Sequence, residues 1–142
     1  MSLHKHAGGC HCGNIRVVVE LHQSAADSPL RACGCSFCRA HGTRTVADPG
    51  GVFKIWAEDW REVNRYRFGT RTADFLMCRG CGVYVGAVCE TESGLRAVAN
   101  VNCLNDRAMF TAAPSVVDYD GEENGDRLAR RAKNWMPAVV HQ

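Results

Sequence analysis

The cysteines of this 142-residue chain fall into three tight groups, and this grouping constrains the fold more than any other feature of the sequence. Seven of the nine cysteines belong to the groups: Cys10 and Cys12 in a C-x-C motif, Cys33, Cys35 and Cys38 in a C-x-C-x-x-C motif, and Cys78 and Cys81 in a C-x-x-C motif. An odd number of cysteines, in a chain whose first residues show no apolar signal-like stretch, argues against a disulfide framework. Cysteines scattered through a core would not group in this way, so we interpret the groups as metal-binding thiolates.

The spacing within each group has a geometric reason. Residues two apart in an extended segment point to the same side, so Cys10 and Cys12 can reach one ion. Cys78 and Cys81 reach one ion if the chain turns between the two sulfurs, and Gly82 supplies backbone freedom for such a turn. The spacing does not tell which groups combine.

The number of ligands predicts two unequal sites. Two, two and three cysteines make one closed four-cysteine site, which is typical of structural zinc, and one three-cysteine site. Three protein ligands leave a fourth position for water or substrate, which is the arrangement of catalytic zinc. Two alternatives stay open: all seven cysteines could serve one folding site with spare thiols, or the C-x-x-C pair could be a thioredoxin-like redox couple. Thiolate-rich tetrahedral ligation favours zinc, although iron is chemically admissible.

The composition is that of an ordinary globular domain, with 46% hydrophobic and 23% charged residues. The formal charge of +2 counts the cysteines as neutral, and seven thiolates holding two zinc ions would make the net charge slightly negative. We therefore do not interpret the charge as a nucleic-acid footprint. Arg127, Arg130 and Arg131 form a short cluster, which we interpret as a solvated helix face. From its length, we expect the chain to form a single domain over residues 1–142. The longest apolar run is too short to span a membrane, and we expect the protein in the cytoplasm.

Hydrophobic periodicity predicts a mainly β fold. Apolar residues alternate over residues 15–21, which is typical of a half-buried strand. Further strands are expected over residues 29–33, 43–47, 52–56, 62–68, 72–77, 83–89 and 95–103. The strands at 72–77 and 83–89 would form a hairpin with the C-x-x-C pair at its tip. Ser36 could cap a helical turn that ends at Gly42, and the best helix candidate is residues 125–135.

The two remaining cysteines and the tryptophans are assigned to structure. We expect Cys89 and Cys103 to be small core residues, and the alternative interpretation is that one of them is a redox thiol. Trp56, Trp60 and Trp135 are expected in the core, although one of them could line a pocket over the second metal.

One histidine is singled out as a candidate for proton transfer. His41 follows Cys38 by three residues, and it is the one candidate proton donor that the sequence suggests. We expect His11, between two ligands, to point away from the metal. The histidines expected to be solvated are His4, His6, His22 and His141.

Three stretches of the chain resemble the motifs of one known family. Residues 8–16 (GGCHCGNIR) resemble the opening G-x-C-x-C-G motif of the glutathione-dependent formaldehyde-activating family, which includes the centromere protein V domain. Residues 33–42 resemble its C-x-C-S-x-C segment, and residues 78–82 resemble its C-x-x-C-G turn. Order and separations agree, so the resemblance covers about residues 8–120. The chain departs from the family pattern at Met77, where an aromatic residue is usual, and at Val83, where a small residue is common.

The resemblance implies a zinc-stapled β-tent of small antiparallel sheets with short helical turns, followed by the C-terminal helix. It also implies a structural zinc on Cys10, Cys12, Cys78 and Cys81, and a second, open and sometimes partly occupied zinc on Cys33, Cys35 and Cys38. The implied activity is that of a carbon–sulfur lyase, which joins or releases formaldehyde and the thiol of glutathione as S-hydroxymethylglutathione. The partners would be a small-molecule thiol such as glutathione and an aldehyde, with neither nucleic acid nor membrane.

Three classes of function follow from the sequence. The first is a zinc-dependent enzyme acting on a thiol–aldehyde adduct, and an open three-cysteine site beside a pocket would favour it. The second is a non-catalytic zinc module that binds a protein or a small ligand, and an exposed apolar patch would favour it. The third is a thiol-based reductase of the methionine sulfoxide reductase type, and a solvent-facing Cys89 or Cys103 would favour it.

Overall fold

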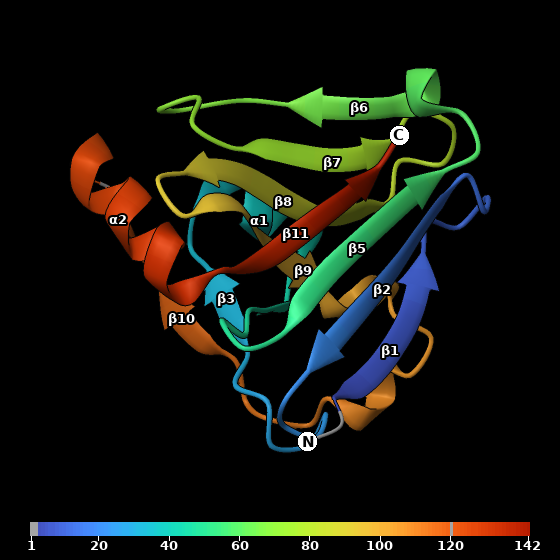
Figure 1. Ribbon diagram of the computed structural model, residues 1–142. Helices are drawn as coiled ribbons and strands as arrows, with labels where there is room; N and C mark the ends of the chain where they lie inside the picture. Colours follow the sequence, from blue (N-terminus) through green and yellow to red (C-terminus); the bar gives the residue numbers. More distant parts are fainter. Residues whose placement is uncertain (1–2, 120) are drawn as a thin grey trace.

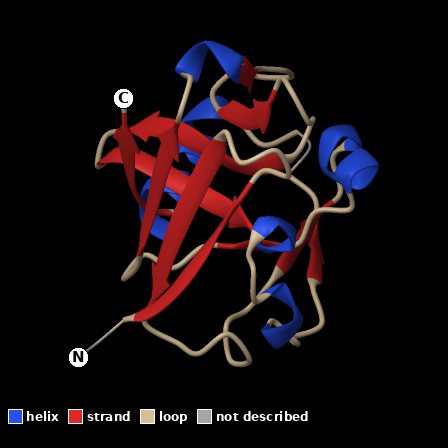
Figure 2. Ribbon diagram, turned by 90° about the vertical axis from the view of Figure 1, so that its right-hand side faces the viewer, coloured by secondary structure: helices blue, strands red, loops and turns tan. Residues whose placement is uncertain are grey.

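The computed structural model describes residues 3–119 and 121–142. These residues have the mainly β fold that the sequence predicts, and eleven strands join into one open mixed sheet (Figure 1). The strands are β1 (His4–Gly9), β2 (Ile15–Leu21), β3 (Arg31–Cys33), β4 (Thr45–Val46), β5 (Val52–Ala57), β6 (Val63–Tyr66), β7 (Asp74–Cys78), β8 (Tyr84–Thr91), β9 (Gly94–Asn100), β10 (Ser115–Val117) and β11 (Met136–His141). The helices are α1 (Ser36–His41), α2 (Asn124–Asn134) and the 3₁₀ segments η1 (Trp60–Glu62), η2 (Val101–Cys103) and η3 (Arg107–Met109). Figure 2 shows the helical segments around the strands.

Strand β9 is the junction of the sheet. One path runs β1-β2-β5-β11-β9-β4-β3-β10, and a second branch leaves β9 through β8 and β7 to β6. Most neighbours are antiparallel, but β11 pairs with β5 and β10 pairs with β3 in parallel. A parallel neighbour needs a long connection, and α2 provides the last part of it by leading the chain directly into β11. The sheet is therefore mixed, and distant segments of the chain meet along it.

The alternation over residues 15–21 is confirmed. Strand β2 has the expected bounds, and it buries Ile15, Val17 and Val19 while the intervening side chains face outward or are half-buried. Each such buried aliphatic side chain stabilises the fold by about 1.5–3 kcal/mol. The same core contains Phe53 from β5 and Met136 from β11, so it lies beneath the strands that hold the first cysteine group in place.

Two local predictions about residues 33–42 and 95–103 need correction. Gly42 ends α1 as expected, with φ +59°, but the cap at the other end is the Cys35 sulfur, which accepts a bond from the Cys38 backbone N–H at 3.4 Å, and not Ser36. The strand expected to reach residue 103 ends at Asn100. The side chain of Asn100 accepts a bond from the Asn102 backbone N–H and starts a 3₁₀ turn.

The N-terminal strand β1 was not predicted, because its residues show no apolar alternation. It pairs antiparallel with β2 over its whole length, and Gly8 lies so close to Leu104 that a Cβ would be 2.6 Å from the Leu104 Cα. The prediction that His6 is solvated is wrong. Its ring is buried against Phe110, and its Nδ1 lies 2.6 Å from Asp106 Oδ2. The other three histidines expected in solvent, His4, His22 and His141, are exposed.

We expect His6→Ala to lower the free energy of unfolding by about 1–3 kcal/mol, because it removes a buried ring and leaves the Asp106 carboxylate without this partner. His4→Ala, at an exposed position of the same strand, is the matched control and should change little. Urea unfolding followed by circular dichroism measures both variants. Equal midpoints for the two variants would contradict the role given to the pair.

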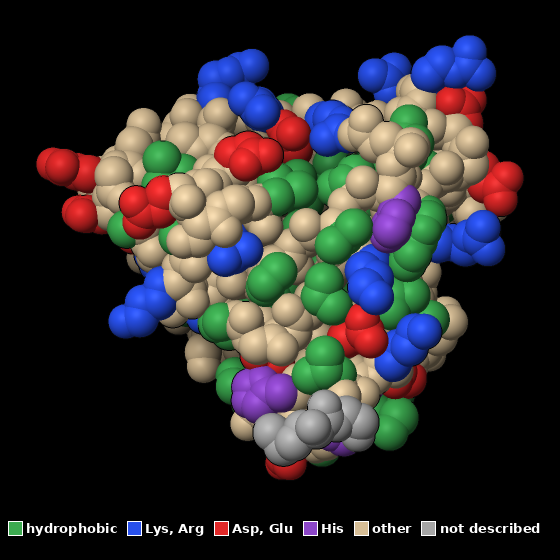
Figure 3. All heavy atoms as spheres, in the orientation of Figure 1, with side chains coloured by type: hydrophobic (Ala, Val, Ile, Leu, Met, Phe, Trp, Pro, Cys, Tyr) green, Lys and Arg blue, Asp and Glu red, His purple; other side chains and the backbone are tan. Residues whose placement is uncertain are grey.

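Charge on the visible face is mixed. In Figure 3, Lys and Arg side chains are interspersed with Asp and Glu, so this face carries no large patch of one sign. Within residues 3–119 and 121–142, no helix is both long and apolar enough to cross a membrane.

Candidate metal centres

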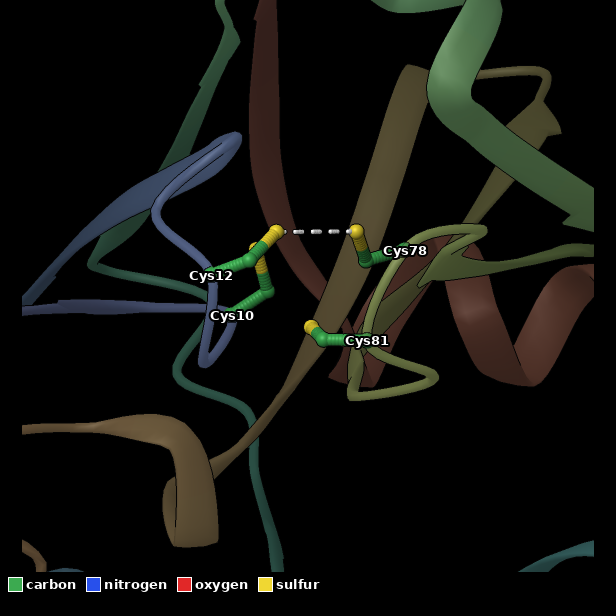
Figure 4. Close-up of side chains that lie close together, drawn as sticks. All are labelled: Cys10, Cys12, Cys78 and Cys81. Carbon is green, nitrogen blue, oxygen red and sulfur yellow. Dashed lines mark hydrogen bonds between the residues drawn. The ribbon is translucent and has the colours of Figure 1, made fainter.

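Four cysteines from two distant hairpins converge on one point (Figure 4). Cys10 and Cys12 come from the turn after β1, and Cys78 and Cys81 come from the turn between β7 and β8. Their four sulfurs all lie within 4.8 Å of one another, with 3.7 Å between Cys10 and Cys12 and 3.5 Å between Cys12 and Cys78. The edge of a tetrahedron with metal–sulfur bonds of 2.3 Å is about 3.8 Å. The four thiols therefore fit a tetrahedral metal ion.

Backbone groups around this cluster support sulfur in its charged form. The Ile15 backbone N–H donates to the Cys10 sulfur at 3.2 Å, which favours a thiolate there. The turn after Cys78 closes with the Gly82 N–H on the Cys78 carbonyl at 2.9 Å, and Gly82 has a left-handed φ of +79°. The resemblance had combined these two pairs of cysteines, and the structure places them together. A metal ion bound here would tie the β1–β2 turn to the β7–β8 hairpin.

The other three grouped cysteines form a separate cluster. Cys33 ends β3, Cys35 caps α1 and Cys38 lies in its first turn, and the three sulfurs also lie within 4.8 Å of one another. The seven grouped cysteines thus lie in two separate clusters. Three thiols fit three corners of a tetrahedral ion, and the fourth corner would belong to another ligand.

The three thiols share their protons unequally. The Cys38 thiol, hydrogen-bonded to Cys33, lowers the pKa of Cys33 to about 5, and the positive charge of Arg130 acts in the same direction. The same bond, together with burial, raises the pKa of Cys38, and burial raises that of Cys35. Since the thiolate is the metal-binding form, Cys33 is the ligand most ready to bind at neutral pH.

A cavity of about 520 Å³ opens beside this second cluster, within the size range of small-molecule sites. All three cysteines line it. Its apolar wall includes Phe68, Phe75, Tyr84, Ala87, Val98 and Trp135, and its lining also includes arginines of α2. Trp135 is thus the tryptophan that lines the pocket, as the sequence allowed for one of the three. The second cluster therefore adjoins a space large enough for a ligand.

The candidate proton donor His41 does not line this cavity. It is exposed at the end of α1, and its ring lies 4.4 Å from that of Phe37. The cavity is lined instead by Tyr84, which the sequence analysis did not single out and which is 2% exposed. Burial, and then the nearby thiolates of the second cluster, raise the pKa of Tyr84 well above its usual value. No local signal in the sequence points to it, because Tyr84 follows a cysteine of the other cluster.

The arginine cluster is not the solvated helix face that the sequence suggested. Arg127, Arg130 and Arg131 all line the cavity, and Arg131 is only 6% exposed. The spacing of three and four residues puts them on one face of α2, but only the loop and strands packed against that face decide that it is covered. Local sequence could not reveal this, because the same pattern occurs on solvated helices.

Neither of the two ungrouped cysteines is fully exposed. Cys89 is buried in the core as predicted, and its sulfur lies 3.5 Å from Arg131 Nη1. Cys103 is half-buried against the core, and burial raises its pKa to about 12, which keeps it a thiol. A protonated or buried thiol is a poor nucleophile, so these positions give no support to the thiol-based reductase.

A crystal structure of a Rhodobacter sphaeroides protein, a target of the Northeast Structural Genomics programme, is similar to this chain. The two are 32% identical in sequence, with a TM-score of 0.55, and the match covers 78% of this chain and 99% of the other. No family model matches the chain. The shared fold and the sequence identity over nearly the whole of the other protein show that this chain belongs to the same family as the Rhodobacter sphaeroides protein.

Proposed function

We propose that this protein is a zinc-dependent carbon–sulfur lyase that acts on a thiol–aldehyde adduct of the S-hydroxymethylglutathione type. The observation that carries the proposal is the three-cysteine cluster beside a cavity of about 520 Å³. The four-cysteine cluster has the closed donor set of a structural site, whereas the second cluster leaves room for a substrate atom. The cysteine motifs of the chain resemble those of formaldehyde-activating proteins, and this resemblance supplies the reaction type.

Zinc bound by Cys33, Cys35 and Cys38 would supply a Lewis acid for the substrate sulfur or the aldehyde oxygen. The apolar wall of the cavity excludes water from the adduct and so strengthens each polar contact inside. Thr43, buried next to α1, and the αL cap at Gly42 keep the cysteine loop in one conformation. The chain's own contribution is therefore a rigid, partly dry site.

A proton must move in each direction of the reaction. When the adduct forms, the thiolate sulfur attacks the aldehyde carbon, a carbon–sulfur bond forms and the carbonyl oxygen takes up a proton. When the adduct breaks, the hydroxyl loses that proton, the carbon–sulfur bond breaks and the sulfur leaves as a thiolate. Tyr84 is the candidate to give and take this proton, because it lines the cavity and its raised pKa keeps it protonated. His41 is the second candidate donor, from the outer end of α1.

The activity is tested by mixing the protein with formaldehyde and a panel of low-molecular-weight thiols that includes glutathione. We expect adduct exchange, followed by NMR, to accelerate by ~100-fold or more over the uncatalysed reaction. The zinc content of the same sample is measured alongside. No acceleration with any thiol, in protein carrying two zinc ions per chain, would remove the proposal.

The proton donor is identified by two matched variants in the same assay. Tyr84→Phe keeps the ring contacts with Phe37 and loses only the hydroxyl, so we expect a rate loss of at least ~10-fold with little change in stability. His41→Ala removes the exposed ring and should leave the rate nearly unchanged. The opposite pattern would assign the proton transfer to His41.

A further inference from the structure

Three arginines of α2 stand in an unusual environment for cations. The side chains of Arg127 and Arg130 are each 15% exposed, and Arg131 is 6% exposed as a whole residue. Placing charge away from water is costly unless each group is paired and hydrogen-bonded. Three such groups on one helix face therefore require a reason.

Their partners are only partly sufficient. Arg130 donates to the Glu122 carboxylate twice, from Nε to Oε2 at 3.1 Å and from Nη2 to Oε1 at 3.1 Å. Its guanidinium carbon also lies 3.6 Å from the centroid of the Tyr119 ring. Arg127 donates from Nη2 to the backbone carbonyls of Tyr119 and Glu122 at 3.0 and 3.2 Å, respectively. Arg131 donates from Nη1 to the Thr72 hydroxyl at 2.7 Å. One carboxylate and a few neutral acceptors thus serve three guanidinium groups in these contacts.

Among residues 3–119 and 121–142, each of the three arginines keeps a buried nitrogen that donates to no acceptor: Arg127 Nε, Arg130 Nη1 and Arg131 Nε. A buried donor without an acceptor is rare in native proteins and costs free energy. Three on adjacent side chains point to an acceptor group that is recognised at this place. Guanidinium groups match carboxylates in shape, since two parallel N–H groups meet two oxygens.

The arginines and the second cysteine cluster belong to one cavity. Arg130 and Cys33 both line this cavity, and Phe75, Ala87 and Trp135 form its apolar wall. The lining also contains the carboxylates of Asp118, Glu122 and Glu123 beside four arginines, Arg31 included. A ligand that contacts both parts needs a sulfur for the cysteine cluster and an anionic group for the arginines.

We propose that Arg127, Arg130 and Arg131 form an anion subsite that selects thiols carrying a carboxylate over neutral thiols of the same size. This inference rests on the proposed function, because it places the substrate sulfur at the cysteine cluster. The subsite determines specificity and binding, while the chemistry belongs to the other end of the cavity. The opposing Glu122 keeps the arginines in position when no ligand carboxylate is present.

Direct binding tests the subsite without any turnover. The zinc-loaded protein is titrated by calorimetry, in the absence of aldehyde, with glutathione and with glutathione diethyl ester, in which both carboxylates are masked. We expect glutathione to bind at least ~10-fold more tightly, as one charge-assisted bidentate pair allows. The advantage should shrink as the salt concentration rises. Equal affinities for the two ligands would overturn the proposal.

Variants assign the effect to the arginines. Arg127→Gln should remove most of the preference for glutathione and leave the affinity for the ester unchanged. The hydrogen bonds of Arg127 go to backbone carbonyls, and its ion pair with Glu122 is long, at 3.9 Å, and is backed by the closer pair of Arg130 with the same carboxylate. Lys133→Gln, on the exposed side of α2, is the matched control that removes one positive charge elsewhere. The subsite would be refuted if the preference for glutathione persisted in both Arg127→Gln and Arg130→Lys. It would also be refuted if Lys133→Gln reduced this preference as much as Arg127→Gln does. Arg130→Lys keeps a positive charge opposite Glu122. A changed preference in this variant therefore does not come from a buried carboxylate that has lost its partner.

The two proposals fail separately. If glutathione is preferred in binding but no thiol shows accelerated adduct exchange, the subsite stands and the lyase activity falls. If exchange is accelerated equally for charged and neutral thiols, the activity stands and the subsite falls. With an active enzyme, Arg127→Gln should raise KM for glutathione by ~10-fold and leave kcat nearly unchanged, since the carboxylate contact is equal in ground and transition states.

Discussion

Cys78→Ser will leave the protein largely unfolded under conditions in which the wild type is stable. Cys78 is 2% exposed at the end of β7, and its sulfur lies 3.5 Å from Cys12, which is 66 residues away in the sequence. Metal binding at a four-cysteine site contributes on the order of 10 kcal/mol to folding. Domains of this size have a net stability of only about 5–15 kcal/mol, so losing this site removes most of it.

Urea unfolding followed by circular dichroism, together with metal analysis, measures this effect. We expect the wild type to carry two ions per chain and Cys78→Ser to show little cooperative transition. A strong chelator should have the same effect on the wild type. Cys103→Ala is the matched control, because Cys103 is half-buried but lies outside both clusters. A Cys78→Ser protein that unfolds at the wild-type urea concentration would show that the four-cysteine cluster does not hold the fold together.

Cys33→Ala should have the largest effect on activity, with a loss of at least ~100-fold in adduct exchange. Cys33 is one of three thiols that could hold the second ion, and its removal leaves only two of them. It lies half-buried at the end of the three-residue strand β3, where a smaller side chain leaves the core unchanged. We therefore expect the fold and the four-cysteine site to survive the substitution.

The rate and the metal content of Cys33→Ala are measured on the same sample. We expect one bound ion per chain in place of two, and an unfolding midpoint close to that of the wild type. Cys103→Ala again serves as the control, since it removes a thiol without touching either cluster. Full activity in a variant that has lost the second ion would show that the chemistry takes place elsewhere.

Local signals in the sequence predicted several elements well. The alternation over residues 15–21 matches β2 residue for residue, because a strand with one buried face must alternate. Gly42 ends α1 in a left-handed conformation that other residues adopt at a cost. The cysteine groups also predicted two unequal clusters, since ligands for one ion must lie near each other along short, turning segments.

Other features of the fold depend on neighbours that are distant in the sequence. Strands β1 and β11 lack strong apolar alternation, and they exist because β2, β5 and β9 offer them unpaired backbone groups. His6 is buried because Asp106, one hundred residues later, meets it across the bridge between β1 and the η2 segment. No local pattern around His6 carries that information.

The sequence by itself determined the number of thiol clusters, their ligand counts and the mainly β class of the fold, because these depend on spacing and periodicity along short segments. Only the tertiary structure decided which cysteine groups combine, since C-x-C and C-x-x-C hairpins can meet in more than one way. It also decided that Tyr84, Trp135 and the arginines of α2 share one cavity with Cys33. Their proximity is created by the packing of α2 against β8 and β9, a contact between segments about 40 residues apart that local chemistry does not encode.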